Sequence, residues 1–345
     1  MNRRGFFLSM ACGAALAGCK SRRNAKRLNV MNWGDYIAPG TINAFEHEFG
    51  VKVRYATYEN NEELFGKIMS GNSGWDVVFP THNRIAPLRE LGLIAPLDHS
   101  RLTKAGNLFA RFQNPLWDPS LDWSMPYMWT TSGIAYNGAR YPIEPTSWAD
   151  LWRPEAKGRL TMLDDVDDVF GAALAKLGYN YNSASAGELR LAQREIITQK
   201  PLVRAYISSE ARDQMVAGDV LIAETFATTA QLAIDGNAEL AYVLPREPYA
   251  AYCDCAVILN ESKRRELAHE FLNFTLRAEV SAEIAQTIRT ATPNEKAFGL
   301  LPAATQDSKT LYPEAATLTR AEWPLTLPPE IVRLRDRLWT EAKAA

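Results

Sequence analysis

The sequence has few of the residues from which enzyme and metal sites are usually built. Only four histidines and four cysteines occur among 345 residues. The histidines are scattered, with no HExxH and no other ligand pair at helical spacing. Gly-x-Ser-x-Gly, GxxxxGK[ST] and GxGxxG motifs are absent, and four cysteines are too few for a disulfide scaffold. The sequence therefore predicts no catalytic centre, no metal site and no cofactor.

Neither sign of charge is in large excess. Lysine and arginine total 38 against 40 aspartates and glutamates, a formal net charge of −2. Because proteins that bind a nucleic-acid backbone carry a basic excess, nucleic acid is not an expected partner. Hydrophobic residues make up 47% and charged residues 23% of the chain, which is typical of a soluble globular protein. A chain of 345 residues is long enough for two domains.

The N-terminus lacks an apolar run long enough to span a membrane, yet it looks like an export signal. A basic start is followed by apolar and small residues over 5–16. The segment that follows resembles the lipobox of bacterial lipoproteins, Leu16-Ala17-Gly18-Cys19. This resemblance implies a signal peptide over 1–18, with cleavage before Cys19 and a lipid on its thiol. The polar, basic residues 19–27 would then form a tether between the lipid and the fold.

Two points about the N-terminus stay open. An ordinary secretory signal that happens to contain a cysteine would also fit. Residues 3–8 resemble a twin-arginine export motif. Basic signal starts often contain arginine pairs, however, so both export routes remain.

After the tether, short apolar runs alternate with amphipathic stretches. Strand patterns occur at 28–33, 51–58, 75–79, 159–163, 220–224, 240–244 and 252–259. Helical patterns occur at 42–49, 61–69, 167–177, 186–199, 210–217, 227–235, 264–277, 278–288 and 330–344. This alternation predicts an α/β fold with mostly parallel sheets flanked by helices.

Acidic and aromatic residues gather at the predicted carboxyl ends of strands, where open α/β sheets bind ligands. Aromatic faces attract ammonium groups, and carboxylates accept hydrogen bonds from them. The grouping is thus typical of a site for an elongated organic cation. Its members are Trp33, Asp35, Tyr36, Asp164, Asp165, Asp167, Asp168, Glu224, Phe226, Tyr252 and Asp254.

These residues also have structural interpretations. Acids in the first turn of a helix, such as Asp165 and Asp168, are ordinary caps that complement the helix dipole. Trp33 and Tyr36 could simply belong to the core. Asp254 is harder to explain in this way, because an unpaired charge inside an apolar strand is costly.

The two cysteines beside Asp254, Cys253 and Cys255, would share one face of the strand. A lone C-x-C is a weak signal for metal. We interpret the pair as small buried hydrophobic residues, with a strained redox pair as the alternative.

Several collinear segments match one known family. Residues 32–40 fit an opening NW-x-[DE]-Y pattern. Further matching segments are 55–59, 61–62, 146–152, 164–165, 169–170, 271–274, 291–294, 310–313 and 322–323. On these segments, the chain resembles the bacterial spermidine/putrescine-binding lipoproteins, which are the receptors of polyamine ABC importers.

The resemblance implies a two-lobe periplasmic-binding-protein fold of type II with a double-crossover hinge. Each lobe would be a mostly parallel sheet flanked by helices, and the lobes would close around a ligand. Lobe one would comprise 28–132 and 255–296. Lobe two would comprise 133–254 and 297–345.

The resemblance also assigns ligand contacts position by position. Aromatic contacts with the polyamine chain are implied for Trp33, Tyr36, Phe226 and Tyr252. A hydroxyl contact is implied for Thr81, and Asp35 matches an acid at the lip of the cleft. Asp165 and Asp168 match an acidic pair that receives an amine, whereas Asp254 matches the acid that clamps a terminal amine. The family pattern is not kept at Gly34, Asn83, Thr290 and Pro324. Asp168 is shortened from a family Glu, and Phe226 and Tyr252 each replace a family Trp.

The expected function is therefore a receptor of the periplasm or cell envelope, anchored by lipid and monomeric. It would capture a polyamine of the putrescine/spermidine class between its lobes and deliver it to the permease of an ABC importer. Enzyme activity is not expected. Two alternatives are a receptor for another small cationic or amino-acid-like solute, and an exported ligand-sensor subunit that docks on a membrane signalling protein.

Overall fold

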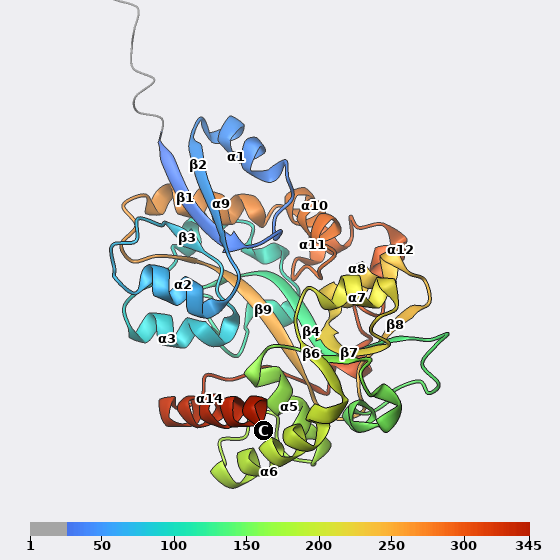
Figure 1. Cartoon of the computed structure of the whole chain (residues 1–345). Coiled ribbons are helices and arrows are strands. Elements are labelled where there is room, and N and C mark those ends of the chain that lie inside the picture. Colours follow the sequence, from blue (N-terminus) through green and yellow to red (C-terminus); the bar gives the residue numbers. More distant parts are fainter. Residues whose placement is uncertain (1–25) are drawn as a thin grey trace, which may run out of the picture.

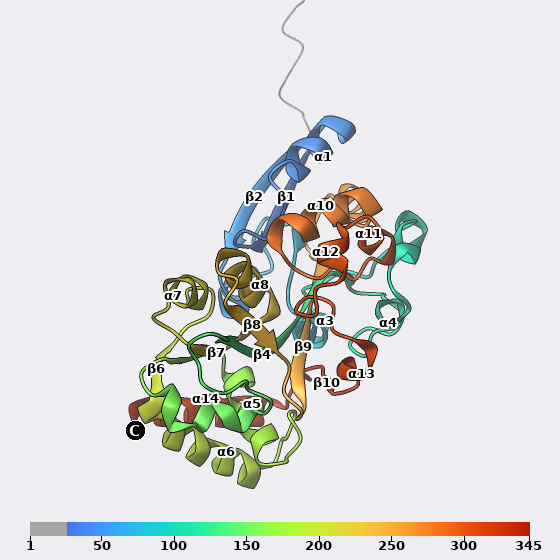
Figure 2. The same ribbon diagram turned by 90° about the vertical axis from the view of Figure 1, so that its right-hand side faces the viewer.

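The structure is a computed structural model that describes residues 26–345 (Figure 1). The predicted signal peptide, Cys19 and nearly all of the predicted tether lie outside the described residues. Within the described part, two α/β lobes are joined by long strands, as Figures 1 and 2 both show.

The first lobe is built on three parallel strands, β1 (Arg27–Trp33), β2 (Lys52–Tyr58) and β3 (Val77–Val78). Longer helices around them are α1 (Thr41–Phe49), α2 (Asn61–Ile68), α3 (Ile85–Glu90), α9 (Arg265–Thr275) and α10 (Ala278–Ile288). Gly50 ends α1 in the left-handed conformation, with φ of 62°, as its position in the sequence predicts. The side chain of Asn60 caps α2 by accepting a hydrogen bond from the backbone N–H of Glu63.

The second lobe repeats this architecture with β5 (Leu160–Met162), β6 (Val203–Tyr206) and β7 (Ile222–Phe226), which are also parallel. A further strand is β8 (Leu240–Val243). Its helices are α5 (Val166–Lys176), α6 (Ala186–Gln199), α7 (Ala211–Ala217), α8 (Ala227–Gly236) and α14 (Pro329–Ala344). The small residues of α5 are buried, which lets this helix lie close to the sheet.

Two long antiparallel strands, β4 (Met125–Asn137) and β9 (Tyr249–Ile258), connect the lobes. The first half of β4 pairs with β9, and its second half, from Ser132 onward, pairs with β7 and β8. The order of the main sheet is β2-β1-β3-β9-β4-β7-β5-β6. At Gly133, where β4 enters the second lobe, an added Cβ would lie 2.6 Å from the ring of Tyr242. The crossing therefore has no room for a side chain at this point.

The tail after α10 corrects one predicted boundary. We expected everything after residue 296 in lobe two, but Ala297, Leu301 and Leu311 belong to the first lobe's core. Short helices in this region and nearby are α4 (Ala110–Gln113), α11 (Glu295–Phe298), α12 (Ala303–Gln306) and α13 (Ala315–Leu318). The tail contacts lobe two where Ser308 donates to Gln231 of α8, where β10 (Ala321–Glu322) pairs with the start of β9, and where α14 packs on α5 and α6. The apolar residues between 297 and 311 fix this segment to lobe one.

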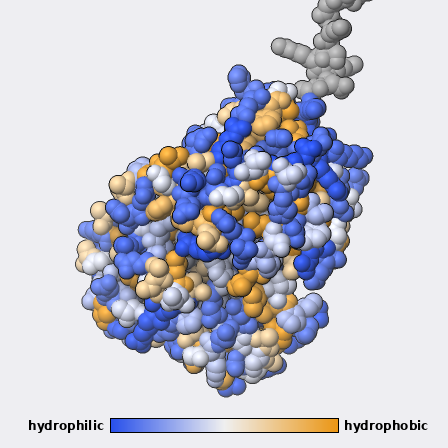
Figure 3. All heavy atoms as spheres, turned by 180° about the vertical axis from the view of Figure 1, so that it is seen from behind, coloured by the Kyte–Doolittle hydropathy of each residue, from blue (hydrophilic) through white to orange (hydrophobic). Residues whose placement is uncertain are grey.

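None of the helices between residues 26 and 345 is long and apolar enough to cross a membrane. On the face shown in Figure 3, the described hydrophobic residues form small separate groups among hydrophilic ones. A broad apolar patch for a partner is therefore not a feature of this face.

Candidate functional site

The first part of the site surrounds Asp254, at the joint between the lobes. Asp254 lies on β9, and its carboxylate accepts hydrogen bonds from two hydroxyl groups of lobe one. The hydroxyl of Tyr36 donates to Oδ2 and that of Thr81 donates to Oδ1, each over 3.0 Å. Burial raises the pKa of Asp254 to about 6, while the two hydroxyls act to lower it. Tyr36 and Thr81, both named from the sequence, therefore do contact Asp254.

Aromatic side chains of lobe one pack together at the end of β1. The indole of Trp33, half-buried at the end of β1, donates a hydrogen bond to the carbonyl oxygen of Phe79 over 2.8 Å. Its ring packs at a tilt on Tyr58, with 4.8 Å between centroids. Asp35 follows in an exposed turn with φ of 51°, which leaves its carboxylate in solvent. Trp33 is thus held rigidly, whereas Asp35 lies at the rim.

The second part of the site is the first turn of α5. Asp165 is the N-cap, and its Oδ1 accepts hydrogen bonds from the backbone N–H groups of Asp167 and Asp168 over 2.8 and 3.2 Å. The capping role considered from the sequence is therefore present. Burial, with a smaller effect of Asp167, raises the pKa of Asp165 to about 6. A cap with this pKa can still gain or lose a charge near neutral pH.

Asp168 lies deeper than Asp165 and is 0% exposed. Its Oδ1 accepts hydrogen bonds from Ser132 and Tyr181, and its Oδ2 accepts one from Tyr252 over 3.0 Å. Burial raises the pKa of Asp168 well above the ordinary value, and neighbouring Asp165 raises it further. Within the described residues, the hydrogen bonds of this carboxyl group are thus all with hydroxyls.

Tyr252 links the two parts of the site. It lies two residues before Asp254 on β9, so both side chains point to the same face, about 7 Å apart along the strand. Its ring meets Phe226 edge-on, with 5.9 Å between centroids. The strand β9 thus carries one acid directly and contacts the other through the hydroxyl of Tyr252.

Glu224, on β7, is a further acid of lobe two. It is 0% exposed, and neither carboxylate oxygen has a hydrogen-bond partner among the described residues. Burial raises its pKa well above the ordinary value, and Asp168 adds to the effect. Because an isolated buried charge is costly, this environment favours the neutral form of Glu224.

Ser132, Tyr181 and His82 were not predicted from the sequence. Ser132 lies on β4, a strand missing from the sequence prediction, and Tyr181 lies in the loop after α5. Buried His82 accepts a hydrogen bond at Nδ1 from the N–H of Cys253 and donates one from Nε2 to the carbonyl oxygen of Pro324. Burial lowers the pKa of His82 to about 3, so this ring joins β9 to the tail in its neutral form.

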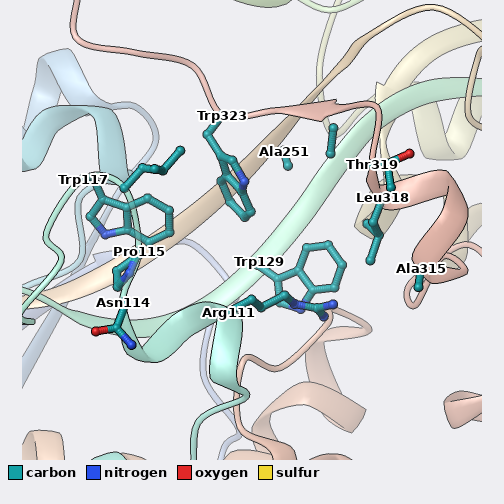
Figure 4. Close-up of a pocket in the computed structure, with 12 residues that line it drawn as sticks. Arg111, Asn114, Pro115, Trp117, Trp129, Ala251, Ala315, Leu318, Thr319 and Trp323 are labelled. Atoms are coloured by element: carbon teal, nitrogen blue, oxygen red, sulfur yellow. The ribbon is translucent and has the colours of Figure 1, made fainter.

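The opposite face of β4 and β9 has a different character. A cavity of about 360 Å³ lies there, and Figure 4 shows Trp117, Trp129 and Trp323 around it. Trp129 pairs with Cys253 across the two strands, so it points away from Tyr252 and Asp254. Cys253 and Cys255 are buried, free thiols with 3.9 Å between sulfur atoms. They occupy the positions expected of small hydrophobic residues.

The described residues contain no cluster of three histidine, cysteine or acidic side chains that could hold a metal ion. What the site offers instead is two carboxyl groups, Asp254 and Asp168, that tyrosine hydroxyls hold near the strands joining the lobes. This arrangement can bind a cation through hydrogen bonds, charge and ring faces. The fold and the site together define a two-lobe solute-binding protein.

The comparisons agree with this class. The chain belongs to the family of bacterial extracellular solute-binding proteins, whose profile matches residues 40–312. It is 36% identical over 318 residues to the spermidine/putrescine-binding periplasmic protein of Escherichia coli, covering 91% of each chain. Binding, not catalysis, is the activity of such relatives, as the missing enzyme motifs predicted.

Two solved structures show the same fold over almost the whole chain. The spermidine/putrescine ABC transporter substrate-binding protein PotD of Streptococcus pneumoniae is 31% identical, with a TM-score of 0.84 and coverage of 93% of this chain and 99% of that one. The Tp0655 lipoprotein of Treponema pallidum is 26% identical, with a TM-score of 0.83 and coverage of 92% and 99%. The prediction of a two-lobe binding-protein fold is confirmed.

Proposed function

We propose that this protein is an extracytoplasmic receptor that captures a polyamine of the putrescine/spermidine class between its lobes and delivers it to an ABC importer. The observation that supports this most directly is Asp254, a carboxyl group held by the hydroxyls of Tyr36 and Thr81. The names of the relatives described above support the same class of ligand.

The chemistry of an α,ω-diamine fits the two ends of the site. One ammonium group would be received by Asp254, and the second by the acids at the start of α5, with Asp165 more accessible than Asp168. The methylene chain between them would lie against Trp33, Tyr36 and the ring of Tyr252. Each charge–hydrogen-bond contact in such a sheltered place is stronger than it would be in water.

A second candidate is a receptor for another small cationic or amino-acid-like solute. It is favoured by Thr290, where the resembling family has a tyrosine. The hydroxyl of Thr290 is buried and shares a hydrogen bond of 2.6 Å with Thr228, so it offers nothing to a ligand. The aromatic wall is therefore thinner here than the family pattern implies. A third candidate is a sensor subunit. It would be favoured if the neighbouring gene encoded a signalling protein and not a permease.

Calorimetry with putrescine, spermidine, spermine and agmatine tests the leading proposal. Saturable one-to-one binding of at least one polyamine, with native mass spectra showing the matching mass increase, is the expected result. No heat with any of the four would refute the polyamine class. Binding of a small amino acid in the same assay would select the second candidate.

We further propose that the mature protein is a monomer tethered to the cell envelope through lipid on Cys19, as the Treponema pallidum relative is named a lipoprotein. Exchange of Cys19 for serine would then give a protein that leaves the detergent phase and the membrane fraction. Unchanged partitioning of Cys19→Ser would refute the lipid anchor and leave the binding function untouched.

A further inference from the structure

The C-terminal helix α14 buries one arginine against the acidic start of α5. Arg335 is 4% exposed. Its Nη1 donates to Oδ1 of Asp167 over 2.9 Å, and its Nη2 donates to the carbonyl oxygens of Tyr181 and Ser183 over 3.3 and 3.4 Å. A planar guanidinium can hold these three acceptors at once, which a lysine ammonium on its flexible stem does less well.

Two of the three residues that Arg335 holds, Asp167 and Tyr181, also contact the carboxyl groups of the site. Asp167 donates its backbone N–H to Asp165. Tyr181 donates its hydroxyl to Oδ1 of Asp168 over 3.0 Å. The ring of Tyr181 lies directly against α5 at Gly171, where an added Cβ would be 1.9 Å from it. Arg335 thus holds the backbone of the loop that presents Tyr181, and Gly171 leaves the space that its ring occupies.

Arg335 also balances the charge at this end of lobe two. Asp165, Asp168 and Glu224 are buried or half-buried acids, and Asp167 lies among them. Other charged groups near this turn are Asp164, which pairs with Lys343 over 3.3 Å, and Arg84, which acts to lower the pKa of Asp165. Asp336 of α14 lies near Asp167, and Glu62 in turn acts on Asp336. Among the residues of α14 that reach this turn, Arg335 is the buried cation.

We propose that Arg335 is a positioning residue for the amine-binding carboxyl groups of lobe two, acting through Asp167 and Tyr181 without touching the ligand. The proposal deepens the proposed function and rests on it for the identity of the ligand. As a consequence, α14 sets the charge and placement of Asp165 and Asp168. This helix is far in sequence from the first strands of the site.

The first experiment needs no ligand. Carboxyl ¹³C resonances of labelled aspartate are titrated in the parent and in Arg335→Gln, with Asp165→Asn to assign the signal. Loss of the guanidinium leaves Asp167 uncompensated beside Asp165, and a nearby negative charge raises a carboxyl pKa. The expected result is a titration midpoint for Asp165 above the value of about 6 in the parent. An unchanged midpoint would overturn the proposal.

A matched control separates this effect from general destabilisation. Arg264 pairs with Asp76, an aspartate of lobe one that is 1% exposed, over 3.3 Å. Arg264→Gln also removes the partner of a buried acid, but at a distance from α5. It should lower the denaturation midpoint and leave the Asp165 titration where it is. A shift as large as that of Arg335→Gln would overturn the proposal.

The second experiment measures amine binding by calorimetry at pH 7.5. Arg335→Gln should weaken the affinity for the tightest-binding polyamine by about tenfold, the lower end of the loss seen when residues that orient metal ligands are removed. Arg335→Lys keeps the charge but loses the fork to the carbonyl oxygens. It should keep the Asp165 midpoint and still bind more weakly than the parent. Parent-like affinity of both variants would overturn the proposal.

The two experiments also keep this inference apart from the proposed function. If the parent binds no amine but the Asp165 midpoint still rises in Arg335→Gln, the electrostatic role of Arg335 stands and the polyamine function fails. If amines bind normally to every variant, the function stands and the positioning role fails. In the double variant Asp167→Asn/Arg335→Gln, the titration midpoint of Asp165 should return toward the parent value, because the uncompensated charge of Asp167 is removed.

Discussion

Tyr252 on β9 donates its hydroxyl to Asp168 at the start of α5 over 3.0 Å. This bond joins a strand that crosses between the lobes to the acidic turn of lobe two. Asp254 lies two residues further along the same strand and is bonded to lobe one through Tyr36 and Thr81. A rotation of one lobe that moves Tyr252 away from Asp168, or Asp254 away from Tyr36 and Thr81, would therefore break hydrogen bonds to these acids.

The first prediction removes only that hydroxyl. Tyr252→Phe keeps the ring that meets Phe226 but takes one donor from Asp168. Loss of a hydrogen bond to a carboxyl group costs roughly 1.5–3 kcal/mol when the acid is ionised. We expect weaker amine binding by calorimetry and an upward shift in the pH at which binding is half-maximal.

Tyr206→Phe is the matched control for this change. The hydroxyl of Tyr206 is also in lobe two and buried, but it has no hydrogen-bond partner among the described residues. Its removal should leave amine binding unchanged and stability equal or slightly higher. Equal effects of the two substitutions would show that the bond between Tyr252 and Asp168 does not matter for binding.

The second prediction concerns Asp254→Asn, which keeps the size of the side chain and removes its charge. Loss of one partner from a sheltered charge pair costs about 2–5 kcal/mol, so amine affinity should fall by roughly 30-fold to several thousand-fold. Asp307→Asn, at an exposed acid in the tail, should bind as the parent does. If Asp254→Asn binds polyamines within about threefold of the parent, Asp254 does not receive an ammonium group.

The third prediction is a pH dependence of binding. Burial raises the pKa values of Asp254 and Asp165 to about 6. An ammonium ligand prefers the ionised carboxylates, so affinity should rise with pH through this window. Each group should contribute about tenfold between pH 5 and pH 7.5. Calorimetry across this range measures how the affinity changes with pH. An affinity that does not change would contradict the proposal that Asp254 and Asp165 receive ammonium groups.

A rise in pH should strengthen amine binding through these carboxyl groups but lower the stability of the ligand-free protein. A carboxyl whose pKa is raised on folding resists ionisation that the unfolded chain undergoes freely. The free energy of unfolding should therefore fall as pH rises from about 4 to about 6 and then stay level. For Asp254 the difference corresponds to about 3 kcal/mol. Asp254→Asn should remove this part of the pH dependence in denaturant titrations of ligand-free protein.

Most of the helices and strands could be predicted because their patterns are local. The predicted helices at 186–199 and 278–288 have the observed bounds, since an apolar face at helical spacing is visible in any short window. The strand β4 was missed. Its residues are buried on both faces and include Pro126 and Gly133, so neither alternation nor composition indicates a strand.

The site was predicted less completely, and for a different reason. The proximity of Tyr36, Thr81 and Asp254 came from the family resemblance and from the position of acids at strand ends. The roles of Ser132 and Tyr181 depend on which hydroxyl points at Asp168, and no spacing in the sequence encodes that. The late crossing of the tail likewise depends on packing that involves Ala297 and Leu311, not on a local pattern.

The last prediction tests the strand that connects the lobes. Gly133 pairs with Thr225 of β7 where β4 enters lobe two. A Cβ there would lie 2.6 Å from the ring of Tyr242 and 2.8 Å from the carbonyl oxygen of Val243. The carbonyl belongs to a paired strand and cannot move away easily, so Gly133→Ala should destabilise the fold by about 1–3 kcal/mol, the usual cost of overpacking.

Because Tyr242 donates its hydroxyl to the carbonyl oxygen of Thr131 over 3.0 Å, displacement of its ring would also disturb β4 beside the site. Gly133→Ala should thus lower both the denaturation midpoint and the amine affinity measured by calorimetry. Gly106→Ala is the control, since nothing lies within 4 Å of a Cβ at that position. If Gly133→Ala is as stable as Gly106→Ala and binds amines like the parent, the close packing of Tyr242 on β4 does not constrain the connection between the lobes.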